Sequence, residues 1–162
     1  MTKEVLDLFN EQGEPLNKTI INGESQAKGE FIKGVLIWIK NSDGQFLIQK
    51  TSNRKGGLYS ATGGHVASGE TPQDTCVREI GEELGISITK AELKFVAKFK
   101  YDQKQVLFDV YYMLKNIPIK NMKLQTKEVD SVYWLNADKI EALIKTDSFR
   151  FASAGTFKFV KN

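Results

Sequence analysis

The stretch "GGHVASGETPQDTCVREIGEELGI", from Gly63 to Ile86, joins a glycine-rich turn to one strongly marked helix. Thr71 is a favourable N-cap residue, and Pro72 suits the first helical position, where its missing N–H removes no hydrogen bond. Gly85 can adopt the left-handed backbone conformation that ends many helices. These signals predict a helix from Pro72 to Leu84.

The predicted helix has an acidic side that opposes its own electrostatics. Glu79, Glu82 and Glu83 share this side near the C-terminal end, with Arg78 at its edge. Each carboxylate there is unfavourable by about 0.3–1 kcal/mol because it faces the negative end of the helix dipole. A bound divalent cation would turn this repulsion into a binding site, and oxygen-only ligands favour Mg²⁺, Mn²⁺ or Ca²⁺. The alternative, from charge alone, is a solvated glutamate-rich surface.

The other side of the helix is apolar, which predicts that it packs on a core. Its members recur at helical spacing: Cys76, Val77, Ile80 and Leu84. Cys76 is therefore expected in the core rather than in a reactive site.

Composition limits the classes of protein that the sequence fits. The chain has 162 residues, 41% of them apolar and 27% charged, which suits one domain over residues 1–162. No apolar run reaches the roughly 18–20 residues that a membrane helix needs, and the acidic N-terminus does not resemble a signal peptide. A net charge of +3 without a long basic run does not indicate nucleic-acid binding. One cysteine and one histidine exclude an internal disulfide and a zinc site of nitrogen and sulfur ligands, and fit a cytoplasmic protein.

Several short strands and two clear helices predict a mixed β-sheet packed against helices, an α/β (α+β) fold. Residues 1–22 contain two apolar runs around a turn and predict an N-terminal β-hairpin. "GVLIWI", residues 34–39, is apolar on both alternating faces and predicts a strand covered on both sides. A second helix is expected to begin after Asn136, and the tail from residue 148 is read as a final strand.

The spacing of the opening stretch resembles the signature of the Nudix family, G-x5-E-x7-R-E-U-x-E-E-x-G-U, where U is aliphatic. Every fixed position is present between Gly64 and Ile86, so residues 63–86 form a complete Nudix box. The hairpin "GVLIWIKNSDGQFLIQK" upstream and "EVDSVYWLNADKI" downstream also resemble the family. The resemblance implies an α/β/α sandwich with a mixed sheet. It also implies metal-dependent hydrolysis of a pyrophosphate bond, in a nucleoside diphosphate-linked or other organic diphosphate substrate.

The resemblance also implies roles for the residues of the box. The glutamates would coordinate Mg²⁺ or Mn²⁺, Gly64 would lend its carbonyl to the metal, and Arg78 would hold a box glutamate in position. Glu70 and Gly63 would support the site. The box glutamates meant here are Glu79, Glu82 and Glu83.

Two glutamates are candidates for the general base that takes a proton from the attacking water. Glu79 is the first candidate. Glu128 is the second, because it precedes Trp134 by six residues, where family members often place a glutamate that joins the metal or acts as base. The alternative for Glu128 is an exposed loop residue.

Four further residues are candidates for contact with the substrate. His65 lies in the glycine turn beside the predicted metal, and the basic stretch "QKTSNRK" contains Lys50, Arg54 and Lys55. Their alternatives are a turn histidine bonded to backbone and solvated loop cations.

Two other functions stay open from the sequence. The hairpin and the segment around His65 also resemble the isopentenyl-diphosphate isomerase branch of the superfamily, but Gly63 occupies the place of the cysteine that those isomerases use as acid. The chain therefore resembles an isomerase-like hydrolase. A non-catalytic nucleotide-binding module is the other alternative, although such modules usually lose box glutamates. The expected partner is a small-molecule diphosphate, and family habit alone suggests a homodimer.

Overall fold

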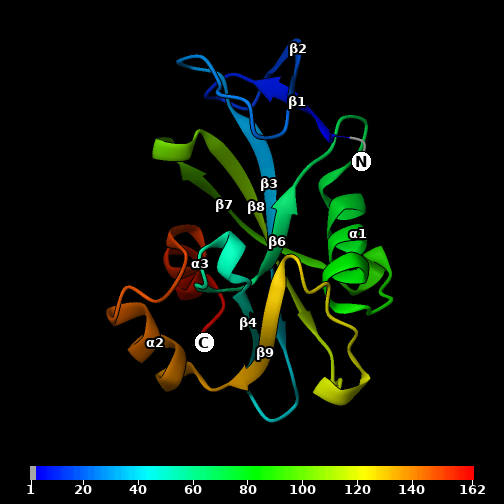
Figure 1. Ribbon diagram of the computed structural model, residues 1–162, viewed down its shortest axis with the longest axis vertical. Coiled ribbons are helices and arrows are strands. Elements are labelled where there is room, and N and C mark those ends of the chain that lie inside the picture. The colour runs from blue at the N-terminus through cyan, green and yellow to red at the C-terminus, as the bar shows by residue number, and fades with distance from the viewer. Residues whose placement is uncertain (1–2) are drawn as a thin grey trace.

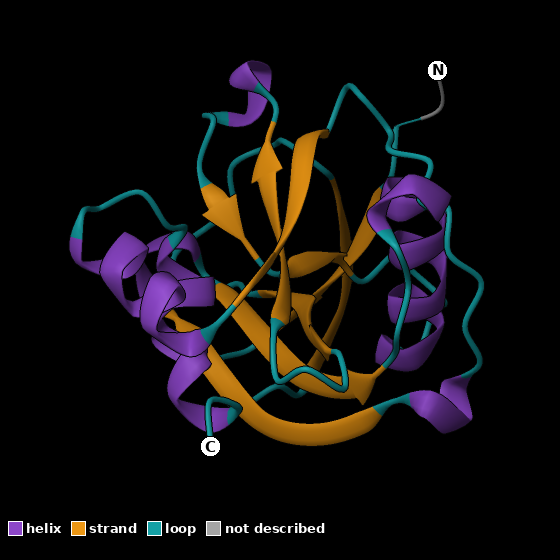
Figure 2. Ribbon diagram, turned by 90° about the horizontal axis from the view of Figure 1, so that it is seen from below, coloured by secondary structure: helices purple, strands orange, loops and turns teal. Residues whose placement is uncertain are grey.

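A mixed β-sheet lies between two helical layers in the computed structural model, which describes residues 3–162 (Figures 1 and 2). Helix α1 covers one face of the sheet, and α2 and α3 cover the other. The strands run β5-β4-β3-β8-β7, with β6 paired to β3 and β9 paired to β4. Their bounds are β3 Ile32–Lys40, β4 Phe46–Thr51, β5 Tyr59–Ser60, β6 Thr62–His65, β7 Lys94–Tyr101, β8 Val106–Leu114 and β9 Val129–Leu135. The predicted α/β/α sandwich is confirmed.

Strand β3 is the centre of the sheet, as its two-sided apolar pattern predicts. It pairs in parallel with β8, from Ile32 opposite Val106 to Lys40 opposite Leu114, and antiparallel with β6. Alternate residues of β3 enter two cores. One core lies under α1 and includes Val35, Ile37 and Ile39, and the other lies under α2 and α3 and includes Trp38.

Helix α1, Pro72–Leu84, has the predicted bounds. The Thr71 hydroxyl accepts a hydrogen bond from the Asp74 N–H, and Gly85 ends the helix with φ of 66°. Cys76, Ile80 and Leu84 are fully buried against the sheet. The opposite face of the helix is thereby directed away from the core.

The predicted N-terminal hairpin is present as β1, Val5–Phe9, and β2, Pro15–Ile21. It is joined to the main body by bridges from Leu6 to Ala67 and from Phe9 to Phe31. Leu6 also belongs to an apolar cluster with Ile32 and Val106. The hairpin is therefore packed beside the turn that precedes α1.

The prediction of a final strand in the tail is wrong. Helix α2, Ala137–Lys145, begins after Asn136 as expected, but the tail forms a second short helix, α3, Phe151–Thr156. Small residues in α3 let it approach the sheet closely: a Cβ added at Gly155 would lie 2.8 Å from a Phe99 ring carbon. In the sequence, alternating phenylalanines give the tail a strand-like pattern, so this helix was not predicted. None of the helices in residues 3–162 is long and apolar enough to span a bilayer.

Candidate active site

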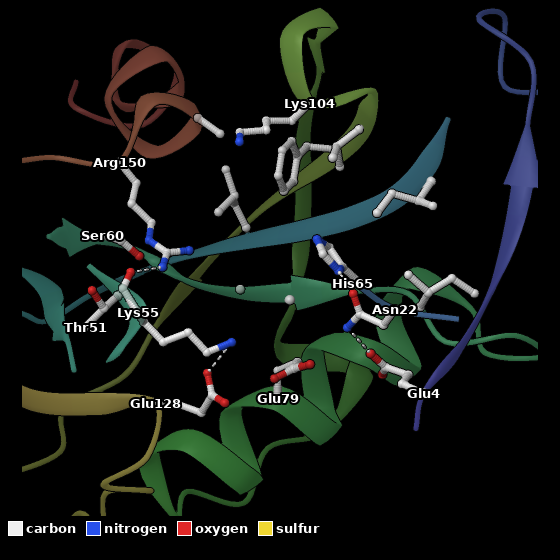
Figure 3. A pocket seen from close by; sticks show the side chains of 18 of the residues that line it. Glu4, Asn22, Thr51, Lys55, Ser60, His65, Glu79, Lys104, Glu128 and Arg150 are labelled. Carbon is white, nitrogen blue, oxygen red and sulfur yellow. Dashed lines mark hydrogen bonds and ion pairs between the residues drawn. The ribbon is translucent and has the colours of Figure 1, made fainter. Parts of the chain in front are cut away.

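A cleft of about 1070 Å³ lies between the exposed face of α1 and the segments across from it (Figure 3). Glu79 rises from α1, and Glu128 comes from the loop before β9 on the same side. Arg150 reaches in from the start of α3, and Glu4 and Asn22 come from the N-terminal hairpin. The cleft is thus assembled from segments spread over most of the chain.

Arg78 organises the acidic side of the cleft. Its Nε donates to Glu70 Oε1 at 2.7 Å and its Nη2 to Glu70 Oε2 at 3.0 Å, a bidentate pair. Its Nη1 donates to Glu79 Oε1 at 3.0 Å and more weakly to Glu82 Oε2 at 3.4 Å. A fourth carboxylate, Glu4, accepts from Nη2 at 3.2 Å. One guanidinium therefore fixes three residues of the box and one of the hairpin.

Glu70 and Gly63 each make contacts that hold neighbouring residues of the site in place. Glu70 accepts a further hydrogen bond from the Thr75 hydroxyl at 2.7 Å, and its bonds to Arg78 hold the pKa of Glu70 below the usual value. Gly63 lies where β6 meets β3, and a Cβ there would be 2.4 Å from the Val35 carbonyl oxygen. Only glycine allows this close pairing of the two strands.

Glu79 lies directly against the backbone of Gly64. A Cβ added to Gly64 would be 2.2 Å from Glu79 Oε1, so the missing side chain leaves the space that the carboxylate occupies. The Glu79 side chain is 13% exposed. Burial raises the pKa of Glu79 to about 7, although the neighbouring Arg78 charge opposes the rise. The single contact with Arg78 therefore does not offset the burial of this carboxylate.

Glu83 is buried one helical turn beyond Glu79. It accepts a hydrogen bond from Gln49 Nε2 at 3.2 Å, and Gln49 in turn accepts one from the Thr62 hydroxyl at 3.1 Å. Burial raises the pKa of Glu83 to about 8, and the charge of Glu79 adds to this effect. Gln49 and Thr62 were not singled out in the sequence. Strand alternation on β4 and β6 was the only signal that could have found them.

The three box glutamates point in different directions. Glu82, half exposed, lies along Arg78, whereas Glu79 faces Gly64 and Glu83 faces Gln49. Within residues 3–162 no three acidic, histidine or cysteine side chains form a ready-made metal cluster. The donor chemistry nevertheless fits a hard divalent cation, because the buried Glu83, the largely buried Glu79 and a side-chain-free backbone at Gly64 adjoin the same cleft.

Glu128 lines the cleft and is paired with a lysine. Lys55 Nζ lies 3.1 Å from Glu128 Oε2 (Figure 3). The 52–57 loop and the loop before β9 are also joined through their backbones, because the Ser52 N–H donates to the Glu128 carbonyl at 3.0 Å. Glu128 therefore lies at the cleft rather than in a remote loop, and its partner in this structure is Lys55.

His65 belongs to a hydrogen-bonded chain that begins in the hairpin. Its Nδ1 lies 3.2 Å from Asn22 Oδ1, and Asn22 Nδ2 donates to Glu4 Oε2 at 3.0 Å. Since Glu4 only accepts, the Asn22 oxygen faces the ring and Nδ1 carries the proton. Burial, followed by the charges of Lys55 and Arg150, lowers the pKa of His65 below 6.5.

Two of the residues predicted to contact the substrate are not brought into the cleft. Of residues 3–162, the cleft lining includes neither Lys50 nor Arg54. On β4 the side chains alternate, so Gln49 and Thr51 face the cleft whereas Lys50 lies over the Tyr59 ring. Arg54 is exposed on the 52–57 loop. The cleft lining does include Lys55, the third cation of the same basic stretch, together with Lys104 and Arg150, which the sequence did not single out.

Comparison with known proteins identifies relatives over nearly the whole chain. Residues 30–154 match the NUDIX domain family. An uncharacterized Nudix hydrolase of Listeria innocua is 35% identical over 150 residues, which cover 90% of this chain and 88% of the relative. The structure is similar to a crystal structure of DR0079 from Deinococcus radiodurans, with a TM-score of 0.81 and 24% identity over 96% of this chain and 98% of that one.

Two more distant structures carry ligands. One is the NUDIX domain of Shewanella oneidensis NrtR complexed with ADP ribose, with a TM-score of 0.67 and 14% identity over 86% of this chain and 92% of that one. The other is a bifunctional NMN adenylyltransferase/ADP ribose pyrophosphatase from Francisella tularensis, complexed with AMP and a manganese ion. Its TM-score is 0.65 at 15% identity, over 79% of this chain and 40% of that one.

Proposed function

Because the chain belongs to the Nudix family and is a pyrophosphohydrolase of that family, we propose that it hydrolyses a pyrophosphate bond in a nucleoside diphosphate-linked or other organic diphosphate substrate. The observation that carries this proposal is the pair of carboxylates, the largely buried Glu79 and the buried Glu83, that adjoins an open cleft. Each has a raised pKa, because burial outweighs the contacts that favour the charged form. Such perturbed groups in a cleft are typical of catalytic sites.

Glu79, Glu82 and Glu83, with the carbonyl of Gly64, are the residues that would hold Mg²⁺ or Mn²⁺. A divalent cation bound there would neutralise charge on the diphosphate and lower the pKa of water. The manganese ion in the Francisella structure supports this choice of metal. Arg78 would keep Glu79 and Glu82 aimed at the cleft through the hydrogen bonds already described.

We assign the general base to Glu79, with Glu128 as the second candidate. Glu79 lies in the cleft on a rigid helix, where it can accept a proton from water at a carboxylate oxygen. Glu128 would first have to leave Lys55. A Glu128→Gln variant that loses turnover as completely as Glu79→Gln would reverse this assignment.

The test is a screen of diphosphate compounds with products separated by chromatography. It should include ADP-ribose, because a structural neighbour binds it, together with nucleoside diphosphates, nucleotide sugars, dinucleoside polyphosphates and thiamine pyrophosphate. We expect turnover that requires Mg²⁺ or Mn²⁺, stops with EDTA, and disappears in Glu83→Gln while circular dichroism shows a folded protein. Turnover that survives both EDTA and Glu83→Gln would contradict the proposal.

The isomerase alternative has no support in this site. Gly63 takes the place of the isomerase cysteine, and Cys76 is fully buried in the core under α1. Conversion of isopentenyl diphosphate to its allylic isomer without release of phosphate would restore that alternative. Cytoplasmic location and a homodimeric state stay predictions, to be tested by cell fractionation and by light scattering.

A further inference from the structure

The cleft has a cationic side across from the acidic face of α1. Lys55 and Arg150 are 95 residues apart in sequence, yet Arg150 Nη2 donates to the Lys55 carbonyl at 2.8 Å (Figure 3). Both residues line the cleft. Among residues 3–162, no carboxylate oxygen lies within 4.0 Å of the Arg150 guanidinium, in contrast to Arg78 with its four partners.

Arg150 is held by a rigid backbone. Its N–H donates to the Tyr59 carbonyl at 2.9 Å, and the Tyr59 N–H donates to the Ser148 carbonyl at 2.8 Å. The intervening Phe149 is buried in the core under α2 and α3. The guanidinium therefore extends into the cleft from a fixed point on the edge of the sheet.

We propose that Arg150 and Lys55 form a phosphoryl-binding subsite that holds one phosphate of the diphosphate substrate opposite the carboxylates of α1. The contact with the Lys55 carbonyl uses Nη2, so Nε and Nη1 stay available for a phosphoryl group. Lys55 adds a mobile point charge beside it. This inference rests on the proposed function, since it specifies how the same cleft orients its substrate.

Lys55 has to exchange partners for this subsite to form. Its ion pair with Glu128 is partly exposed, at 41% and 31% of the two side chains, and such pairs are weak. The backbone bond from Ser52 to Glu128 does not depend on it. A phosphoryl group can therefore draw the Lys55 ammonium away from Glu128 while both loops stay in place. This exchange also frees the Glu128 carboxylate for its proposed role as second candidate base.

The first experiment measures binding without turnover. Titration calorimetry of the full chain with methylenediphosphonate in the presence of Mg²⁺ is compared for wild type, Arg150→Gln, Lys55→Met and Arg54→Gln. Arg54 is the matched control, because it is a cation of the same loop outside the cleft lining. We expect at least about a tenfold loss of affinity for Arg150→Gln and Lys55→Met, as for a lost bond to a charged group, and no change for Arg54→Gln.

The second experiment separates substrate binding from a structural role of Lys55. With the best substrate of the screen, we expect Lys55→Met to raise KM while kcat stays within about threefold, because uniform binding is what is removed. If Lys55 only positions Glu128, kcat falls and KM does not move, which would overturn the subsite. Circular dichroism and thermal unfolding confirm that each variant is folded.

The outcomes distinguish this subsite from the proposed function. Equal weakening by all three charge removals, or no binding of methylenediphosphonate to wild type, overturns the subsite even if turnover is found. Selective weakening by Arg150→Gln and Lys55→Met supports it even if the screen finds no hydrolysis, in which case the proposed function fails alone.

Discussion

The two sides of the cleft differ in how they are built. The acidic side is formed by α1, a single 13-residue helix. Within it, Arg78 contacts Glu79 and Glu82 of the same helix and Glu70 just before it, all within eight residues in sequence. The cationic side is assembled from the 52–57 loop and the segment at Arg150, which meet through a single hydrogen bond. One side is thus set by local spacing, and the other exists only because the chain folds.

The two sides also differ in how far their charges are satisfied. Arg78 is surrounded by carboxylates, but two of the glutamates on the same helix keep raised pKa values, because burial outweighs that one cation. Across the cleft, Arg150 faces open space. The difference indicates that a cation would relieve unfavourable electrostatics on the acidic side. On the cationic side Lys55 pairs with Glu128, whereas Arg150 has no carboxylate partner among residues 3–162. The predictions below test this contrast.

The largest effect is expected in the pH dependence of stability of the metal-free protein. Burial raises the pKa of Glu83 from 4.5 to about 8 in the folded state. Below pH 4.5 Glu83 is protonated in both the folded and the unfolded protein. Between pH 4.5 and 8 it is ionised in the unfolded protein but still protonated in the folded one. The free energy of unfolding therefore falls as pH rises from 4.5 to 8, on the order of 5 kcal/mol from this group.

Urea unfolding in EDTA measures this effect, with Glu83→Gln as the reference that lacks the ionisable group. Relative to Glu83→Gln, the wild type should lose free energy of unfolding as pH rises from 4.5 to 8. Mg²⁺ at pH 8 should then raise the stability of wild type more than that of the variant. A difference that stays constant from pH 5 to 8 would show that Glu83 is not a strained carboxylate.

The acidic side and most of the fold could be predicted from the sequence because the signals that specify them are local. Helix periodicity, the Thr71 cap and the Gly85 stop act within a few residues, so α1 and its acidic face could be located in advance. Contacts such as that between Lys55 and Arg150 depend on how the strands pair, which no local pattern encodes. The position of Lys50 outside the cleft could not be predicted for a related reason. A basic stretch shows charge, but only the pleat of β4 decides which face of the sheet each side chain takes.

The second prediction concerns the close contact of Gly64 with Glu79. In Gly64→Ala the new methyl group would lie 2.2 Å from Glu79 Oε1 and 2.8 Å from its Cγ, so the carboxylate must move. We expect kcat/KM to fall about 100-fold, as for a misplacement near 1 Å. Gly81→Ala is the control, because a Cβ there meets only the Ile86 carbonyl at 3.8 Å and should stabilise α1 without loss of activity.

The third prediction concerns the geometry of Arg78. Arg78→Lys keeps the charge but cannot make the bidentate pair with Glu70 and reach Glu79 as well. We expect about a tenfold loss of kcat/KM and of Mn²⁺ affinity, which is common when a residue that orients metal ligands is changed. Lys90→Met, which removes an exposed ion pair with Asp74 at the start of the same helix, should leave both values unchanged. Equal activity of Arg78→Lys and wild type would mean that charge alone suffices.

The smallest effect is expected from Glu4, which lies outside residues 30–154 and joins the hairpin to Arg78 and, through Asn22, to His65. In Glu4→Gln one oxygen of the bidentate acceptor becomes an NH₂ group, so Arg78 and Asn22 can no longer both donate to it. If Asn22 turns its amide, its NH₂ faces His65 and the ring proton moves from Nδ1 to Nε2. We expect about a threefold loss of kcat/KM, typical of a partly exposed pair, together with a change of His65 tautomer seen in nitrogen NMR shifts. An unchanged tautomer with the same activity loss would limit Glu4 to its contact with Arg78, and no change in either would leave the hairpin as a purely structural cover.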